Sequence, residues 1–362
     1  MTDIIVDAHQ DIAWNFFNNG RDFRQSAWAQ RRTETDPVFL QHYGYRMVGL
    51  PEALIGRVAL TCGTIFVSPR SLVMYSDEKI YYETPQEAYR LGVQQLDYYH
   101  RLSDEEPRIR LIRSQTDLDE VLASWDNKAN PKNRLFGLVI LMEGADPILE
   151  PAQVEEWYER GLRVIGPAWS STRYSGGTKA LGPLTYLGRE LLENMAGFGM
   201  ILDLAHMAPQ ACYEALGLYE GPLFSSHANP LKFCPDRPDR NLSDEMIRLI
   251  AERDGVMGVM PFNMFLVPGW QMGDRKDAAT MDTFIAVIDH ICQVTGSARH
   301  VGIGSDLDGG FGAESAPVGF DSVANLWDIG PALAARGYAA ADISAILSGN
   351  FLRILRAGLP TK

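Results

Sequence analysis

Short apolar segments separated by amphipathic stretches are the feature that most constrains the fold of this chain. Eight such segments are candidate strands: 4–8, 58–67, 135–142, 162–167, 200–204, 222–226, 255–261 and 301–305. Continuous apolar strands that alternate with helices are typical of a parallel sheet buried on both faces. Eight units of this kind predict an α/β fold, namely a (β/α)8 barrel of the TIM type.

Helix-like segments lie between these strands and after the last one. They cover 85–102, 118–125, 152–160, 185–197, 209–216, 243–253 and 279–295, and two more near 322–336 and 340–355 predict an extra C-terminal helix. Segment 14–56 is too long for an ordinary connection between a strand and a helix. We interpret it as an elaborated loop, with a short helix or hairpin, that covers the mouth of one barrel domain spanning 1–362.

Composition narrows the class of protein. Hydrophobic residues make up 46% and charged residues 22% of the chain, which favours a large packed core. The net charge of −13 argues against nucleic acid or an anionic membrane as the main partner. The four cysteines are far apart and form no CxxC pair, which argues against disulfides. The sequence begins without the basic stretch and apolar run of a secretory signal. It contains no run of about 18 apolar residues, the length needed to span a membrane. We therefore expect a cytoplasmic protein without disulfides or membrane spans.

Metal-ligand side chains follow five of the candidate strands. His9 and Asp11 lie two residues apart at the end of the first strand, so they are expected to point the same way. Four later strands each have one residue of a ligand type immediately after or within two residues of their end: Glu143, His206, His227 and Asp306. Because barrel active sites are built at the carboxyl ends of the strands, these side chains are expected to meet at one rim.

Three histidines and several carboxylates exceed what one zinc ion with an open coordination position needs. They suit two divalent ions that share a bridging carboxylate. Glu143 is the natural bridge because a carboxylate has two oxygens, and no lysine closes a candidate strand to serve as a carbamylated bridge. The mixture of nitrogen and oxygen ligands favours zinc, although manganese, cobalt and iron also bind such sites.

Seven stretches together resemble the membrane (renal) dipeptidase family of metallopeptidases, within the amidohydrolase superfamily. They are DAHQD at 7–11, MEGA at 142–145, DLAH at 203–206, SSH at 225–227, RNLSD at 240–244, GIGSDLDG at 302–309 and SGNFLR at 348–353. The resemblance runs from about residue 4 to residue 356. Each stretch alone is a weak signal, whereas their order and spacing are specific.

The resemblance implies a dipeptidase (EC 3.4.13) with two metal ions that hydrolyses L,L- and L,D-dipeptides with a metal-bridging hydroxide. His9, Asp11 and Glu143 would hold one ion, and Glu143, His206 and His227 the other. Arg240 would bind the terminal carboxylate of the substrate, for which a planar guanidinium is suited. Asp306 would bind substrate and transfer the proton. The resemblance also suggests a homodimer.

Arg240 and Trp169 leave alternatives open. Arg240 follows Asp236 and Asp239, so a surface salt bridge is another interpretation of this arginine. Trp169 stands where the family has a substrate-contacting histidine, and an indole N–H can donate one hydrogen bond but cannot shuttle a proton. Arg173 and Tyr174 are candidate replacement donors.

Two other functions therefore remain under consideration. One is a related hydrolase that acts on another amide, a lactam or an ester. The other is a barrel that binds metal or ligand without turnover. Among the remaining polar residues, Asp308 is expected to support a loop, His290 and His300 are expected to be structural, and His42 is a candidate for the pocket wall.

Overall fold

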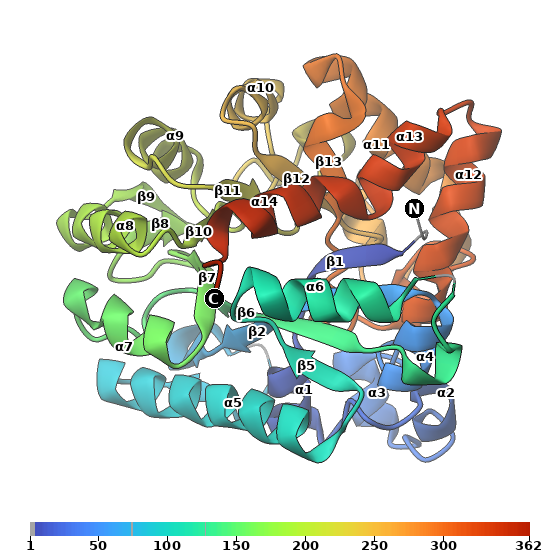
Figure 1. Cartoon of the computed structure of the whole chain (residues 1–362), viewed down its shortest axis with the longest axis horizontal. Helices are drawn as coiled ribbons and strands as arrows, with labels where there is room; N and C mark the ends of the chain where they lie inside the picture. The colour runs from blue at the N-terminus through green and yellow to red at the C-terminus, as the bar shows by residue number, and fades with distance from the viewer. Residues whose placement is uncertain (1–3, 74, 127) are drawn as a thin grey trace.

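The computed structural model describes residues 4–73, 75–126 and 128–362. Parallel strands form a sheet in the order β2-β1-β13-β12-β11-β10-β7-β6-β5 (Figure 1). β2 also pairs with β6 over seven residue pairs, from Leu60 with Gly137 to Phe66 with Glu143, and this pairing closes the ring. The ring consists of β1 (Ile5–Gln10), β2 (Val58–Phe66), β6 (Phe136–Glu143), β7 (Leu162–Gly166), β10 (Ile201–Asp203), β11 (Leu223–Ser225), β12 (Val256–Val259) and β13 (Val301–Ile303).

The predicted (β/α)8 barrel is confirmed, and every predicted barrel strand overlaps one of these strands. A layer of helices covers the sides of the ring and one of its ends (Figure 1). It comprises α5 (Pro85–Glu105), α6 (Gln115–Ser124), α7 (Val154–Glu159), α8 (Tyr186–Gly197), α9 (Pro209–Leu218), α10 (Asp244–Glu252), α11 (Met281–Thr295), α12 (Ile329–Ala335), α13 (Ala340–Ser344) and α14 (Asn350–Gly358). Several begin at a capping side chain; at α10 the Ser243 hydroxyl accepts a hydrogen bond from the Met246 N–H, as expected for an N-cap.

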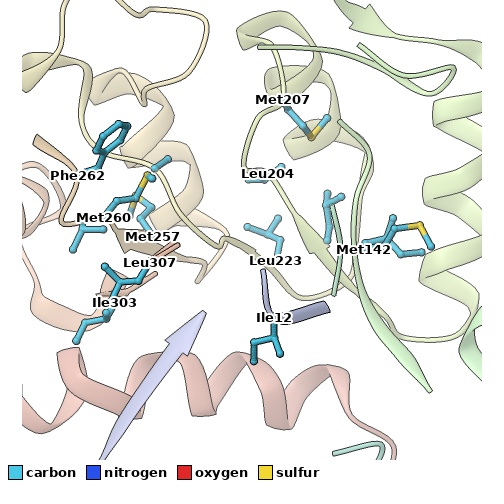
Figure 2. Packing of buried hydrophobic residues seen from close by; sticks show 14 of the residues in the cluster. Ile12, Met142, Leu204, Met207, Leu223, Met257, Met260, Phe262, Ile303 and Leu307 are labelled. Atoms are coloured by element: carbon cyan, nitrogen blue, oxygen red, sulfur yellow. The ribbon is translucent and has the colours of Figure 1, made fainter. Parts of the chain in front are cut away.

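Two hydrophobic clusters hold the barrel together. The larger includes Met142 of β6, Leu223 of β11, Met257 of β12 and Ile303 of β13, and Figure 2 shows part of it. The second cluster joins buried residues of seven ring strands to the apolar face of α14, where Phe351 and Ile354 are buried. α14 crosses the amino ends of the strands (Figure 1) and contacts β1, β10, β12 and β13. The opposite, carboxyl rim is therefore the open end.

The segment after β1 contains the short helix that is one of the two predicted alternatives, but it is richer in helix than predicted. It contains four short helices and no hairpin: α1 (Ile12–Asn19), α2 (Ala27–Gln30), α3 (Pro37–Tyr43) and α4 (Leu50–Ile55). Each is too short to show the periodicity of an amphipathic helix, which explains why the sequence pattern did not reveal them. Ser26 and Asp36 cap α2 and α3 with their side chains.

Five short strands lie outside the ring and were not predicted. β5 (Ile109–Leu111) pairs with the first residues of β6. β3 (Ser68–Pro69) pairs with β4 (Tyr81–Tyr82), and β8 (Ser175–Gly177) forms an antiparallel pair with β9 (Ala180–Leu184). Within the described residues, no helix is both long enough and apolar enough to cross a membrane.

Candidate metal centre and substrate cavity

The five predicted metal ligands converge at the carboxyl rim around Glu143. The Nε2 atoms of His206 and His227 lie 3.1 and 3.5 Å from Glu143 Oε1. On the other side, His9 Nε2 lies 3.6 Å from Glu143 Oε2 and 3.8 Å from Asp11 Oδ1. Each oxygen of Glu143 therefore faces a different set of side chains, which is the arrangement that a bridging carboxylate needs.

Three groups of side chains have ligand atoms within 4.8 Å of one another: His9, Asp11 and Glu143; Glu143, His206 and His227; and His9, His227 and Asp306. The donor set fits divalent metal ions, because His9 Nε2 is buried and has no hydrogen-bond partner among the described residues. A buried polar atom without a partner is costly unless another species completes its coordination. Neutral imidazole nitrogens and carboxylate oxygens are suitable zinc ligands.

The charges of the cluster favour a bound cation. Burial opposes protonation of His9, but Glu143, Asp11 and Asp306 outweigh it and raise the pKa of His9 to about 10. Burial and the charge of Glu143 raise the pKa of Asp11 to about 6. Burial and Arg240 lower the pKa of His206 to about 4, so this imidazole is neutral at pH 7. The carboxylates around His9 attract a cation, and the neutral His206 has a nitrogen lone pair that can bind one. Both properties favour binding of a metal ion instead of a proton.

A buried serine fixes two of the imidazoles. Ser226 Oγ donates a hydrogen bond to Asp203 Oδ2 at 2.6 Å and lies 2.8 Å from Nδ1 of His227 and 3.4 Å from Nδ1 of His9. Since the hydroxyl proton points to Asp203, Ser226 can accept from both Nδ1–H groups and leave the Nε2 lone pairs free. Ser226 and Asp203 belong to motifs that the sequence displays, but their supporting role was not predicted.

Two threonines complete this support, and neither belongs to a pattern that predicts such a role. Thr178, in the turn between β8 and β9, lies 3.0 Å from Nδ1 of His206. Thr64 of β2 donates a hydrogen bond to Asp11. Thr178 contacts the ring nitrogen of His206 opposite the one that faces Glu143, and Thr64 contacts Asp11 Oδ1, so both threonines restrict the orientation of a ligand.

The backbone turns sharply where two of the side chains leave their strands. His206 has a φ of 64° and Asp306 a φ of 53°, in the left-handed region that side-chain-bearing residues seldom adopt. The Asp306 N–H donates to the His9 carbonyl at 3.2 Å, so this turn is joined to the first strand. Non-glycine residues in this conformation cluster at functional sites.

A cavity of about 350 Å³ opens above the cluster, a size typical of small-molecule sites. Arg240 lines it together with Glu143 and Asp306. The Arg240 side chain is buried and its Nη1 has no hydrogen-bond partner among the described residues. Its guanidinium lies over the ring of Phe265, 5.5 Å from the centroid. The surface salt bridge considered above is therefore wrong, and the arginine is available to an anion in the cavity.

Trp169 also lines the cavity, beside Phe66 and 6.2 Å from His206 between ring centroids. The two residues considered as replacement donors do not. Arg173 donates to the side chain of Asp146 and to nearby carbonyls, and the Tyr174 hydroxyl donates to the Ile148 carbonyl. That prediction was wrong because the chain turns after Trp169 and directs both side chains behind the cavity wall.

The other polar residues have structural contacts. Asp308 accepts hydrogen bonds from two backbone N–H groups, of Met47 and Val48, as expected for a loop-supporting residue. His290 binds Asp244, and His300 lies 2.9 Å from the Gly255 carbonyl. His42 stacks on Tyr75, which lines the cavity, but is not itself among the lining residues.

The sequence matches a protein-family model across residues 1–359, described as "Membrane dipeptidase (Peptidase family M19)". An uncharacterized dipeptidase of Schizosaccharomyces pombe is 32% identical over 209 residues. That alignment covers 56% of this chain and 48% of the yeast protein, so it spans about half of that relative. Dipeptidase aclJ of Aspergillus oryzae is 25% identical over 359 residues, which cover 97% of this chain and 77% of the fungal protein.

Solved structures share the fold. A metallopeptidase from Rhodobacter sphaeroides, liganded with a phosphinate mimic of the dipeptide L-Ala-D-Ala, superposes with a TM-score of 0.79 at 21% identity. The match covers 99% of this chain and 100% of that one. The likeness confirms the barrel architecture over the whole length.

Proposed function

This chain belongs to the membrane dipeptidase family, peptidase family M19, a family of metal-dependent hydrolases, and we propose that it hydrolyses the single peptide bond of dipeptides. The observation that supports this most directly is the position of Arg240. A buried guanidinium with a free Nη1 lies in the same cavity as the Glu143 cluster. A dipeptide bound through its terminal carboxylate would present its only peptide bond near that cluster.

We propose two metal sites that share Glu143. His9 and Asp11 would complete one, and His206 and His227 the other, in agreement with two of the three close groups of ligand atoms. Zinc suits the mixture of nitrogen and oxygen donors. Two bound ions would supply an activated water as the nucleophile and would polarise the scissile carbonyl.

The remaining steps fall to the protein's own side chains. Arg240 would bind the substrate carboxylate, since a guanidinium can donate two parallel hydrogen bonds to it. Asp306 would accept a proton on its carboxylate and donate it to the leaving nitrogen. Asp306 is buried beside the cluster, with Oδ1 3.8 Å from His9 Nε2, and it lines the cavity in which the leaving nitrogen would lie. Trp169 would contact the substrate and help exclude water.

Trp169 favours one second candidate. In place of a histidine it offers a bulky apolar surface with one N–H donor, and the cavity wall beside it includes Phe66 and Trp14. The alternative is therefore a hydrolase of the same metal centre that acts on a larger apolar amide, lactam or ester.

A substrate panel and metal analysis test the proposal together. The purified protein is incubated with L,L- and L,D-dipeptides and with non-peptide amides, lactams and esters, with and without chelator, and its metal content is measured. We expect chelator-sensitive hydrolysis of dipeptides and about two ions per chain. Glu143→Gln should abolish activity, whereas Glu193→Gln, at an exposed position of α8, should not. Failure to cleave any dipeptide would exclude a dipeptidase, and faster cleavage of another class would favour the alternative.

A further inference from the structure

One wall of the cavity carries more positive charge than a terminal carboxylate requires. Besides Arg240, the side chains of Arg237 and Lys179 line the cavity. Neither Arg237 nor Lys179 forms an ion pair with a carboxylate within the described residues. The carboxylates that line the cavity are Glu78 and the members of the metal cluster.

Arg237 and Arg240 lie side by side along this wall. Both leave the same turn, in which the Arg240 N–H donates to the Arg237 carbonyl at 3.2 Å. Each guanidinium also contacts a methionine of the loop after β12: Arg240 Nη2 lies 3.6 Å from Met260 Sδ, and Arg237 Nη2 lies 3.4 Å from Met264 Sδ. Met260 is buried and Met264 is only partly buried. Arg240 is therefore the deeper cation and Arg237 the one nearer the mouth.

The loop after β7 adds Lys179 to the same wall. The Lys179 N–H donates to Asp239 Oδ2 at 2.9 Å, which joins this loop to the turn that carries the two arginines. Lys179 itself is exposed and adopts a φ of 63°. Glu78 lies on the loop after β2, and β2 is diametrically opposite β11 in the ring.

We propose that the preferred dipeptide carries a second carboxylate, as an aspartate or glutamate side chain on its C-terminal residue, and that Arg237 binds it. The inference rests on the proposed dipeptidase function and specifies its substrate class. Arg240 would bind the main-chain carboxylate of the substrate. The neighbouring cation, Arg237, is then available to bind the side-chain carboxylate. The apolar neighbours Met264 and Phe265 exclude water and strengthen the attraction.

Matched pairs of dipeptides isolate the contribution of the charge. L-Ala-L-Glu is compared with L-Ala-L-Gln, and L-Ala-L-Asp with L-Ala-L-Asn, because each pair has nearly the same shape. A hydrogen-bonded charge pair of this kind predicts a kcat/KM about 10- to 100-fold higher for the acidic member. Since Arg237 is only partly buried, the ratio should fall as ionic strength rises.

Substitutions assign the preference to Arg237. Arg237→Gln should bring the Glu/Gln ratio close to one, and Arg237→Glu should reverse it in favour of L-Ala-L-Lys. Arg248→Gln, at an exposed position of α10 away from the cavity, is the matched control and should keep the wild-type ratio. If folded Arg237→Gln protein keeps the wild-type Glu/Gln ratio of kcat/KM, another group binds the side-chain carboxylate. That result would overturn the assignment to Arg237.

The wild-type measurements also separate this inference from the function on which it rests. Equal kcat/KM values for the acidic and amide members, with chelator-sensitive hydrolysis of both, would refute the acidic preference and leave the dipeptidase proposal intact. Absence of hydrolysis of every dipeptide would refute both.

Discussion

Replacing Asp308 by alanine should separate the segment that follows β1 from the barrel rim. The buried carboxylate accepts hydrogen bonds from the Met47 N–H at 2.8 Å and the Val48 N–H at 2.9 Å, and it lies 3.8 Å from Arg21 Nη1. The substitution leaves these two N–H groups without an acceptor. It also removes a negative charge that acts on two buried guanidiniums, those of Arg21 and Arg46.

The structure sets the size of this effect. Two hydrogen bonds to a charged acceptor, at about 1.5–3 kcal/mol each, give an upper range of about 3–6 kcal/mol. Burial raises the pKa of Asp308 above its ordinary value, although Arg21, Arg46 and the two N–H groups oppose it. The partners therefore do not fully offset the cost of burying the charge, and we expect the lower end, a loss of about 3 kcal/mol in the free energy of unfolding.

Urea unfolding followed by circular dichroism measures this loss. Asp104→Ala, at an exposed position of α5, serves as the control and should change the free energy by less than about 0.5 kcal/mol. Asp308→Asn should fall between the two, because an amide keeps one acceptor but turns its NH2 group towards the second N–H. A loss below about 1 kcal/mol for Asp308→Ala would refute the reasoning, since two unsatisfied buried donors cost more than that.

Three further predictions concern the metal centre and the cavity. Glu143→Gln should reduce the metal content from about two ions to fewer than one per chain, measured by mass spectrometry after dialysis; unchanged content would contradict a bridging role. Arg240→Met should lower kcat/KM for dipeptides roughly 100-fold, with a much smaller loss for dipeptide amides, which lack the carboxylate; equal losses would contradict carboxylate binding. Burial lowers the pKa of His9, but Glu143 outweighs it and raises that pKa to about 10 from an ordinary value of 6.5. Protonated His9 therefore stabilises the metal-free fold fully below pH 6.5, and this contribution is lost as the pH rises through about 10. The melting temperature of chelated protein should fall between pH 7 and pH 10 by more than that of metal-loaded protein, and parallel curves would contradict the assignment.

The barrel could be predicted because its strands are continuous apolar runs, a pattern that needs no knowledge of distant contacts. The strands outside the ring lack that pattern. β5 alternates apolar and charged residues over three positions, β8 has glycine at two of its three positions, and β9 includes exposed residues. Their pairing depends on neighbours that fold against them. The short helices after β1 depend in the same way on contacts such as those of Asp308 with Met47 and Val48.

The candidate site followed from the position of ligand-type residues at strand ends, since the barrel topology itself brings those ends together. The residues that orient the metal ligands could not be predicted from this pattern. Thr178 reaches His206 only because the β8–β9 turn folds back over the rim. Arg173 and Tyr174 are close to Trp169 in sequence but face Asp146 and Ile148 instead of the cavity. Side-chain direction in an irregular loop is set by tertiary packing, which sequence spacing does not encode.

The pairing of the first strand with the last has a consequence for biosynthesis. β1 pairs with β13 through Asp7 and Ile303, so one edge of β1 has no partner until nearly the whole chain has been made. At a translation rate of about 5–20 residues per second, this interval lasts roughly 15–60 s. An unpaired strand edge is a template for association with other chains. A nascent or truncated chain that ends before Val301 leaves β1 and β12 without their shared neighbour, and it should be retained by chaperones or aggregate before a metal ion could bind.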